Sequence, residues 1–137
     1  MAVNSHNLRL KLVSNNLHGL NQRHSYAEHL CQNYDIVFLQ EHWLSPSDLG
    51  QLVKISSKII CYLTSVMTLA VSRGCFRGRP FGDVACLVRD HFATRVQLAK
   101  SASRHIILLL DSLLLINVYM PCSSSDSWVD DYLDCLA

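Results

Sequence analysis

The sequence predicts a single α/β domain, and two observations carry that prediction. Near the start, a strand (8–13), a helix (24–34) and a second strand (35–41) follow one another with short connections, which is the order of a βαβ unit. Later, two apolar stretches between residues 106 and 119 flank a two-residue polar turn, as the strands of a β-hairpin do. The chain has 137 residues, which is the length of one ordinary domain.

The first strand and helix rest on local patterns. Leucines alternate with basic residues from Leu8 to Leu12, so we expect a half-buried strand that ends at the polar turn 14–16. Ser25, with Glu28 three residues on, forms a capping box that would begin the helix.

The middle of the chain predicts strands separated by short irregular segments. The nearly continuous apolar run 35–41 is typical of a strand covered on both faces. A short helix is expected over 45–54, and strands are expected over 59–63 and 83–88. Residues 64–82 hold three of the five glycines and a basic cluster, which favours a loop.

Composition and charge exclude several classes of protein. Half of the residues are hydrophobic and 17% are charged, so the chain is neither a disordered tail nor a coiled coil. All 12 Lys and Arg residues lie within 1–121, whereas residues 122–137 carry four Asp and no base. This basic body is compatible with an anionic partner. The acidic tail has one apolar helical face that includes Trp128 and Tyr132, a pattern typical of core or interface packing.

The cysteines and the apolar stretches bear on the compartment. None of the six cysteines forms a C-x-x-C pair, which disfavours a zinc ribbon, and the first 16 residues lack the apolar core of a signal peptide. We therefore expect reduced thiols in an intracellular protein, either nuclear or cytoplasmic. The longest apolar stretch, 106–120, is interrupted by polar residues, so no membrane span is expected.

Polar residues stand where the predicted strands end, and these are the candidate site residues. Asn16 follows the first strand, Glu41 the second, and Asn117 with Tyr119 closes the late hairpin. A carboxylate and an amide brought close together can hold Mg²⁺, which prefers oxygen ligands. From spacing alone an alternative stays open: Asn16 caps a turn, Glu41 is solvated and Tyr119 packs as a strand aromatic.

Four segments then occur in a recognisable order: SNNLHGLN at 14–21, DIVFLQEHWL at 35–44, GRPFGDVACLVR at 78–89 and LINVYMP at 115–121. Together they resemble the endonuclease/exonuclease/phosphatase family, and specifically the endonuclease domain that accompanies reverse transcriptase in non-LTR (LINE-like) retrotransposon polyproteins. The resemblance covers about residues 8–121 and leaves the acidic tail, 122–137, outside.

The resemblance implies a fold and a reaction. The family is a two-sheet α/β sandwich with helices outside, of which this chain would form about one half, a mainly antiparallel mixed sheet with flanking helices. The implied activity is hydrolysis of DNA phosphodiester bonds with Mg²⁺ or Mn²⁺. Asn16 matches the family's Asn beside the metal and the scissile phosphate, Glu41 matches its principal metal ligand, and Tyr119 matches the Tyr that helps to position the phosphate.

A basic loop is the candidate nucleic-acid contact. Arg73, Arg77 and Arg79 are interleaved with Phe76 and Phe81, a combination suited to phosphate contact and base stacking. A solvated surface loop explains the same residues equally well.

Departures from the family pattern limit what the chain is expected to do. His18 stands where Asp or Asn is usual, Asp83 where a second Gly is usual, and Cys122 where Asn is common. Asp83 would strain its turn and repel a phosphate. The later motifs, an Asp-x-Asn pair and a Ser-Asp-His end, are absent from the 137 residues. His18 and His42 lie near the proposed site and could act as substitute bases, but nothing in their spacing sets the close geometry that a general base needs.

We therefore expect residues 1–137 to be a single truncated domain, catalytically incomplete alone, that binds its metal ion weakly. The alternative is a non-catalytic binding or interaction module derived from such a domain. In either case a half-sandwich leaves one sheet face uncovered, so self-association through that face is expected.

Overall fold

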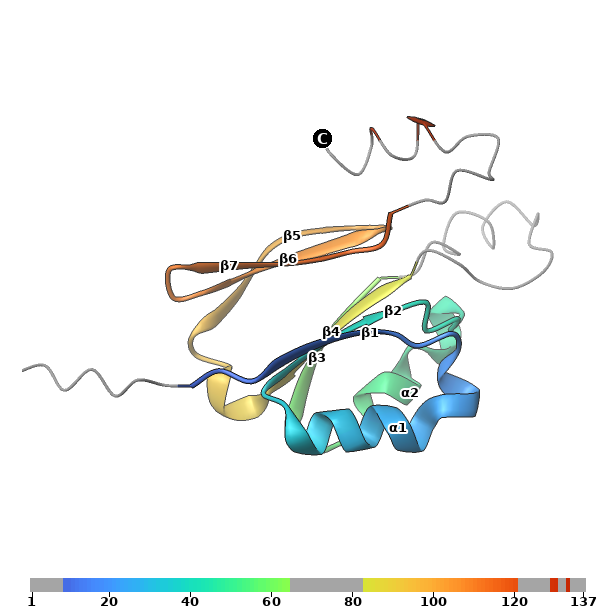
Figure 1. Cartoon of the computed structure of the whole chain (residues 1–137), viewed down its shortest axis with the longest axis horizontal. Helices are drawn as coiled ribbons and strands as arrows, with labels where there is room; N and C mark the ends of the chain where they lie inside the picture. Colours follow the sequence, from blue (N-terminus) through green and yellow to red (C-terminus); the bar gives the residue numbers. More distant parts are fainter. Residues whose placement is uncertain (1–8, 65–82, 121–128, 131–132, 134–137) are drawn as a thin grey trace, which may run out of the picture.

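The computed structural model describes residues 9–64, 83–120, 129–130 and 133, and these form two stacked β-sheets with helices on one outer side (Figure 1). The elements in chain order are β1 (Leu12–Asn16), α1 (Leu20–Asn33), β2 (Ile36–Gln40), the 3₁₀ turn η1 (Pro46–Asp48), α2 (Gly50–Val53), β3 (Ile59–Leu63), β4 (Val84–Arg89), the 3₁₀ turn η2 (Asp90–Phe92), β5 (Val96–Ala102), β6 (His105–Leu110) and β7 (Leu113–Val118).

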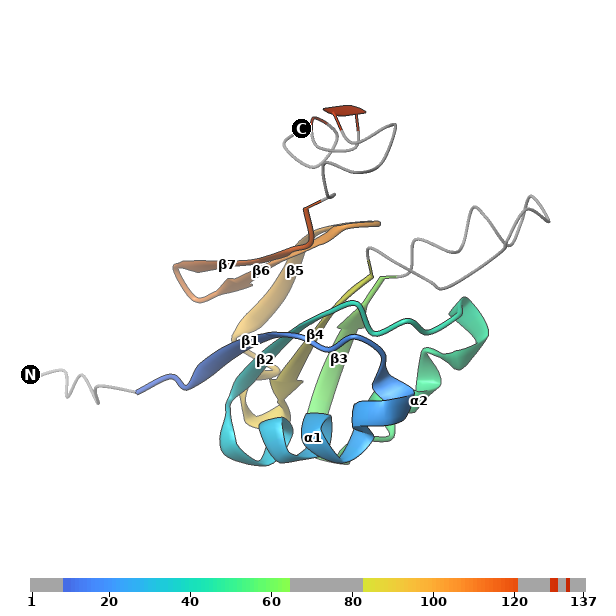
Figure 2. The same cartoon turned by 45° about the vertical axis from the view of Figure 1, so that its right-hand side comes forward.

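The first sheet, which we call sheet A, has the strand order β1-β2-β4-β3. The βαβ prediction is confirmed, because β1 and β2 are adjacent and parallel, with Asn16 opposite Gln40 at their carboxyl ends. The other two pairings, β2 with β4 and β4 with β3, are antiparallel. Both helices lie on the same face of sheet A (Figure 2).

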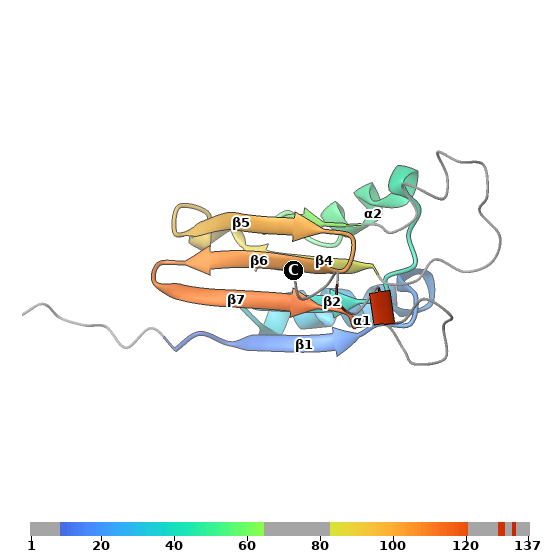
Figure 3. The ribbon, with the colours of Figure 1, turned by 90° about the horizontal axis from the view of Figure 1, so that it is seen from above.

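The second sheet, sheet B, is an antiparallel meander in the order β5-β6-β7. The predicted hairpin is confirmed: Leu110 pairs with Leu113 across the turn, in which Asp111 has φ 52°. Seen from above, β6 and β7 lie over β4 and β2, on the face of sheet A opposite the helices (Figure 3).

Two cores result, one on each face of sheet A. Successive side chains of β2 point to opposite faces, so Val37 and Leu39 pack toward the helices while Ile36 and Phe38 pack toward sheet B. Both sets are buried, which explains why this strand is apolar at nearly every position. The α/β prediction of a partial two-sheet sandwich with a mainly antiparallel mixed sheet is therefore confirmed.

Two boundaries in the first βαβ unit differ from the prediction. The first strand was expected over 8–13, but β1 runs from Leu12 to Asn16, and Ser14 to Asn16, expected as a turn, form its last residues because their backbone pairs with β2. Helix α1 begins at Leu20, has a non-helical Arg23 (φ −129°) inside it, and contains Ser25, so Ser25 is not its N-cap. The start of α1 is set instead by backbone hydrogen bonds from Gly19 and Leu20 to the loop after β2.

Among the other elements, the strands predicted at 59–63 and 83–88 are confirmed within one residue, and 45–54 contains η1 and α2. Strand β5 was not predicted. Most of its residues are exposed and polar or small, so its sequence carries no alternating pattern. Of the loop predicted over 64–82, residues 65–82 lie outside the described residues, as does most of the tail.

Within the part of the chain that the structure describes, no helix has both the length and the apolar character needed to cross a membrane.

Candidate functional site

The candidate site lies where the parallel strands β1 and β2 end. The segments that leave the two strands run side by side and are joined by three backbone hydrogen bonds: Leu17 N–H to Gln40 O (2.8 Å), Gly19 N–H to Glu41 O (2.9 Å) and Leu20 N–H to His42 O (3.0 Å). Side chains on these segments are therefore held close together, at the strand ends where α/β proteins commonly place functional groups.

Unusual backbone angles aim the side chains of these two segments. His18 (φ 50°), Glu41 (φ 54°) and Trp43 (φ 56°) all adopt the left-handed region, as does Gly19 (φ 98°). A Cβ atom on Gly19 would lie 2.6 Å from Cε3 of Trp43, so a glycine is required there by close approach as well as by φ. Left-handed conformations at non-glycine residues are uncommon and cluster at functional sites.

The Glu41 carboxylate is the centre of the site. Its Oε1 accepts a hydrogen bond from the Tyr119 hydroxyl, and its Oε2 lies 2.7 Å from Nδ1 of His18. The Glu41 side chain is 13% exposed and that of His18 is 58% exposed, so the pair opens to solvent on the histidine side. The structure thus brings together two residues, Glu41 and Tyr119, that are 78 positions apart in sequence.

Asn16 joins the same group through His18. Its Oδ1 accepts a hydrogen bond from the backbone N–H of His18 at 3.3 Å, and its side chain is exposed. The three residues predicted from the family motifs, Asn16, Glu41 and Tyr119, are therefore gathered at one end of the sandwich. His18, which the sequence marked as a departure, lies between Asn16 and Glu41.

A buried amide network lies beneath the site. Asn117 is 1% exposed, and its Nδ2 donates to Leu39 O (3.2 Å) and Ala85 O (2.8 Å), while its Oδ1 accepts from Gln40 Nε2 at 2.7 Å. Gln40 Nε2 also donates to Ser14 Oγ at 3.0 Å. Asn117 therefore ties β7 to β2 and β4, and it cannot face a metal ion. The sequence made Asn117 a candidate site residue because it stands near the end of the hairpin, and the structure corrects this: its amide is engaged in contacts between the two sheets.

His42 does not serve as a base, which corrects one of the two alternatives considered from the sequence. It is fully buried, with Nε2 2.9 Å from Thr64 O and Nδ1 accepting the Leu44 N–H at 3.1 Å. Burial lowers its pKa to about 4, so the ring is neutral, and both nitrogens are engaged. Asp83 is also fully buried, 3.8 Å from His42, rather than at the surface facing a phosphate.

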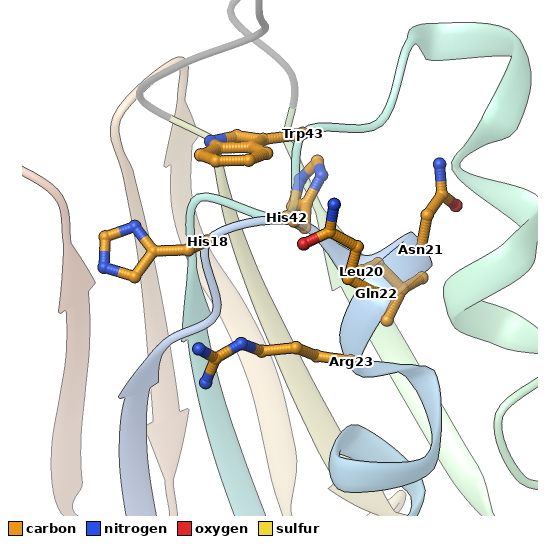
Figure 4. A pocket seen from close by; sticks show the side chains of 8 residues that line it. His18, Leu20, Asn21, Gln22, Arg23, His42 and Trp43 are labelled. Atoms are coloured by element: carbon orange, nitrogen blue, oxygen red, sulfur yellow. The ribbon is translucent and has the colours of Figure 1, made fainter.

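An open pocket of about 400 Å³ adjoins the site on the other side of His18. Figure 4 shows the His18 ring, the Trp43 indole and the Arg23 side chain around it. The His18 and Trp43 rings meet edge to face, with centroids 6.2 Å apart.

The chemistry of the donor set determines how well a divalent cation fits. The Glu41 carboxylate and the Asn16 amide oxygen are ligands that Mg²⁺ uses, and Mg²⁺ usually keeps several waters. No cluster of three or more His, Cys, Asp or Glu side chains placed to hold a metal occurs among the described residues. The donor types fit a divalent cation at Glu41 that would keep several waters in its shell, and the weak binding expected from the sequence stays a prediction.

The residues predicted to contact nucleic acid, Arg73, Arg77, Arg79 and Phe81, lie in the segment 65–82, outside the described residues. Their contribution stays a prediction.

Comparison with known proteins identifies the fold. No protein-family model matches the chain, and no curated protein matches it. Among solved structures, a 3′ phosphatase, NExo, from Neisseria bound to a product DNA hairpin superposes with a TM-score of 0.62 at 16% identity, covering 93% of this chain and 50% of that one. An AP endonuclease from Archaeoglobus fulgidus gives a TM-score of 0.59 at 18% identity, covering 93% of this chain and 49% of that one.

The chain thus spans about half the length of the solved proteins that it resembles. Identities of this size establish the architecture alone. With two stacked sheets, the helices outside and the polar cluster at the strand ends, the described part of the chain has one half of the endonuclease/exonuclease/phosphatase fold.

Proposed function

We propose that this chain is the metal-binding half of a DNA endonuclease domain of non-LTR retrotransposon origin, which hydrolyses phosphodiester bonds with Mg²⁺ or Mn²⁺. The observation that carries the proposal is the convergence of His18 and Tyr119 on the Glu41 carboxylate, with the Asn16 side chain bonded to the backbone N–H of the same His18. The four family-like segments support the retrotransposon origin, and the solved neighbours, one of them bound to a DNA hairpin, support DNA as the substrate.

Each side chain has a distinct task in this proposal. Glu41 would hold the cation, which when bound would neutralise charge on the phosphate and on the leaving oxygen. The Asn16 amide and the Tyr119 hydroxyl position the phosphate by hydrogen bonds. The arginines at 73, 77 and 79 and the ring of Phe81 contact the DNA backbone and bases.

We further propose that the 137 residues alone do not complete the reaction. Phosphodiester hydrolysis also needs a group that orients or activates water, and the family motifs that supply it are absent from the sequence. Members of a cooperating catalytic set are strongly non-additive, so the loss of one leaves only residual activity.

Metal-dependent DNA binding tests the proposal directly. We expect the chain to bind duplex DNA more tightly in Mn²⁺ than in EDTA, and we expect Glu41→Ala to remove that difference. Mn²⁺ broadening of amide signals should centre on Asn16 and Glu41. Broadening centred on the acidic residues at 126–134 would contradict the site. Plasmid nicking that tracks the purified chain and disappears in Glu41→Ala would contradict the incompleteness.

A second function, a non-catalytic interaction module, is favoured by one observation. On the outer face of sheet B, Leu114, Ile116 and Val118 are 54%, 52% and 39% exposed. Monomeric proteins rarely expose contiguous apolar patches of large area. We propose that the chain self-associates through this face. Sedimentation at micromolar concentration should show oligomers that Ile116→Lys disperses, and a stable wild-type monomer would rule the association out.

We propose an intracellular location, nuclear or cytoplasmic, and no membrane partner. The cysteines of the described residues, Cys31, Cys61 and Cys86, are free thiols, and burial raises the pKa of Cys86 to about 12. Free thiols are typical of reducing compartments.

A further inference from the structure

His18 lies where it can share a metal ion with Glu41. We propose that the two side chains together chelate a transition-metal ion that accepts nitrogen ligands, of which Co²⁺ is the test case, in preference to Mg²⁺. This proposal rests on the proposed function in one respect, namely that Glu41 is a metal ligand. It adds that His18 determines which metal ion is bound preferentially.

The two donor atoms lie at ion-pair distance, slightly closer together than a shared ion would hold them. Nδ1 of His18 and Oε2 of Glu41 are 2.7 Å apart. Nitrogen and oxygen ligands lie about 2.0–2.2 Å from such ions, so two of them on one octahedral or tetrahedral ion are roughly 3.0–3.5 Å apart. A small outward rotation of His18 is enough to admit the ion, and its side chain, 58% exposed, is free to make it.

The backbone holds the two residues in this relation. Both have positive φ angles, 50° at His18 and 54° at Glu41, and their segments are joined by the hydrogen bond from Gly19 N–H to Glu41 O at 2.9 Å. The N–H of His18 is held by Asn16 Oδ1. The loop geometry therefore fixes the backbones of the two residues, from which the exposed imidazole can turn relative to the carboxylate.

The donor type decides which ion is preferred. Mg²⁺ takes oxygen ligands almost exclusively, whereas imidazole suits Co²⁺, Ni²⁺ and Zn²⁺, and affinities for divalent ions rise from Mn²⁺ through Co²⁺ to Ni²⁺. With His18 beside Glu41, one of the two side chains that would contact the ion offers a nitrogen atom instead of an oxygen atom. The remaining nearby donors, the Asn16 amide and the Tyr119 hydroxyl, are neutral oxygens and do not restore the charge that Mg²⁺ favours.

The experiment compares Co²⁺ and Mg²⁺ binding to the full chain by calorimetry at pH 8, without DNA. The variants are His18→Asp, which supplies oxygen and tolerates a left-handed backbone, His18→Asn as a second oxygen donor without charge, and Glu41→Gln. Loss of a group that merely supports a ligand costs about 10–100-fold in affinity, so His18→Asn, which removes the nitrogen ligand without adding charge, should weaken Co²⁺ binding at least tenfold. His18→Asp should strengthen Mg²⁺ binding and lower the ratio of Co²⁺ to Mg²⁺ affinity.

A spectroscopic readout separates this site from the other histidines. Co²⁺ should shift the ¹⁵N resonance of Nδ1 of His18 directly, and the largest paramagnetic shifts should surround residues 16–18 and 41. Shifts centred on His24, His29 or His91 would overturn the inference. Folding of each variant is checked by its circular dichroism spectrum, and because His18 is exposed the fold tolerates its replacement.

The outcomes distinguish the proposed role of His18 from the proposed metal site at Glu41. If Glu41→Gln abolishes binding of both ions but His18→Asp leaves the ratio of Co²⁺ to Mg²⁺ affinity unchanged, the role of His18 is wrong and the proposed metal site stands. If Glu41→Gln leaves both affinities unchanged, the proposed metal site is wrong as well.

Discussion

Sheets A and B both contain strongly apolar strands, but the described residues cover them differently. Sheet A is enclosed: along β2 and β4 the side chains are buried on both faces, against the helices on one side and sheet B on the other. Sheet B is covered by described residues on its inner face only. Along β7, Leu115 and Asn117 are buried, whereas the alternate residues Leu114 and Ile116 are more than half exposed.

The difference shows which apolar residues the described fold explains. Burial in this structure accounts for every leucine and valine of β2 and β4. It does not account for the outer residues of β7, which are as apolar as the inner ones. Because antiparallel sheets that face water usually carry polar residues on that side, the outer face of sheet B has the composition of a covered surface. The predictions below test this contrast, from the largest expected effect to the smallest.

Two leucines on opposite faces of sheet B give the largest difference. Leu108 is 0% exposed and Leu114 is 54% exposed. We expect Leu108→Ala to lower the free energy of unfolding by about 2–5 kcal/mol, because it leaves a cavity between the sheets. Leu114→Ala should lower it by less than about 1 kcal/mol in the monomer.

Urea unfolding at low protein concentration measures both values. Equal losses for the two variants would break the contrast between the faces. If the loss for Leu114→Ala grows with protein concentration, the outer face is covered by a second copy in solution.

The buried His42, in the segment that follows β2, should make the free energy of unfolding depend on pH. Burial lowers the pKa of His42 to about 4, against an ordinary value of 6.5. The unfolded chain therefore binds more protons between these pH values, so stability is full above pH 6.5 and falls as the pH drops toward 4. The difference corresponds to roughly 3 kcal/mol for a fully buried group.

Urea unfolding across this pH range checks the dependence, with His42→Gln as the comparison. The variant is less stable at neutral pH because it loses hydrogen bonds, but its stability should fall less between pH 6.5 and pH 4. Parallel pH profiles for the two proteins would show that His42 is not the group responsible.

Removing the side chain of Asn117, which joins the two sheets, should lower the free energy of unfolding by less than Leu108→Ala does. Asn117→Ala leaves the side chain of Gln40 and two carbonyl groups with fewer partners, so we expect a loss of about 1–3 kcal/mol. Ser14→Ala is the matched control, because it removes only the hydroxyl that Gln40 contacts at 3.0 Å, and its effect should be smaller. Thermal unfolding compares the two, and a larger loss for Ser14→Ala would contradict the assigned role.

The smallest effect is expected at the rim of sheet B. Arg95 and Asp111 form an exposed ion pair beside the turn between β6 and β7, and the hydrogen bond from Arg95 lowers the pKa of Asp111. Such pairs contribute little to stability, so Arg95→Gln should leave the urea midpoint unchanged. A carboxyl ¹³C titration should nevertheless show the Asp111 pKa rising in the variant, and the pair's contribution is lost as pH falls through that pKa.

Some of the fold could be predicted because burial leaves a pattern in the sequence. The apolar runs of β2 and β4 and the late hairpin identify themselves by composition. Strand β5 could not be found, since its residues are mostly exposed and only pairing with β6 makes it a strand. The predicted start of α1 was wrong for a similar reason. The helix begins where the backbone N–H groups of Gly19 and Leu20 donate to the carbonyls of Glu41 and His42, which are distant in sequence.

The site shows the same division. Asn16, Glu41 and Tyr119 could be proposed because they stand in family-like motifs at strand ends. The contact of His18 with Glu41 could not, because it depends on left-handed backbone at both residues. The buried position of Asn117 depends on how sheet B stacks on sheet A, which no local pattern records.

The hydrogen bond between Tyr119 and Glu41 also has a consequence for the order of folding. It spans 78 residues of sequence, and the contact of Gln40 with Asn117 beneath it spans 77. Contacts between residues so far apart in sequence form slowly, because closing the intervening chain costs conformational entropy before the contact can contribute any favourable free energy. During synthesis, β1, α1 and β2 leave the ribosome long before β7. The Glu41 carboxylate therefore gains its hydrogen bond from Tyr119 only after most of the two sheets have formed. The site is complete only in the last stage of folding.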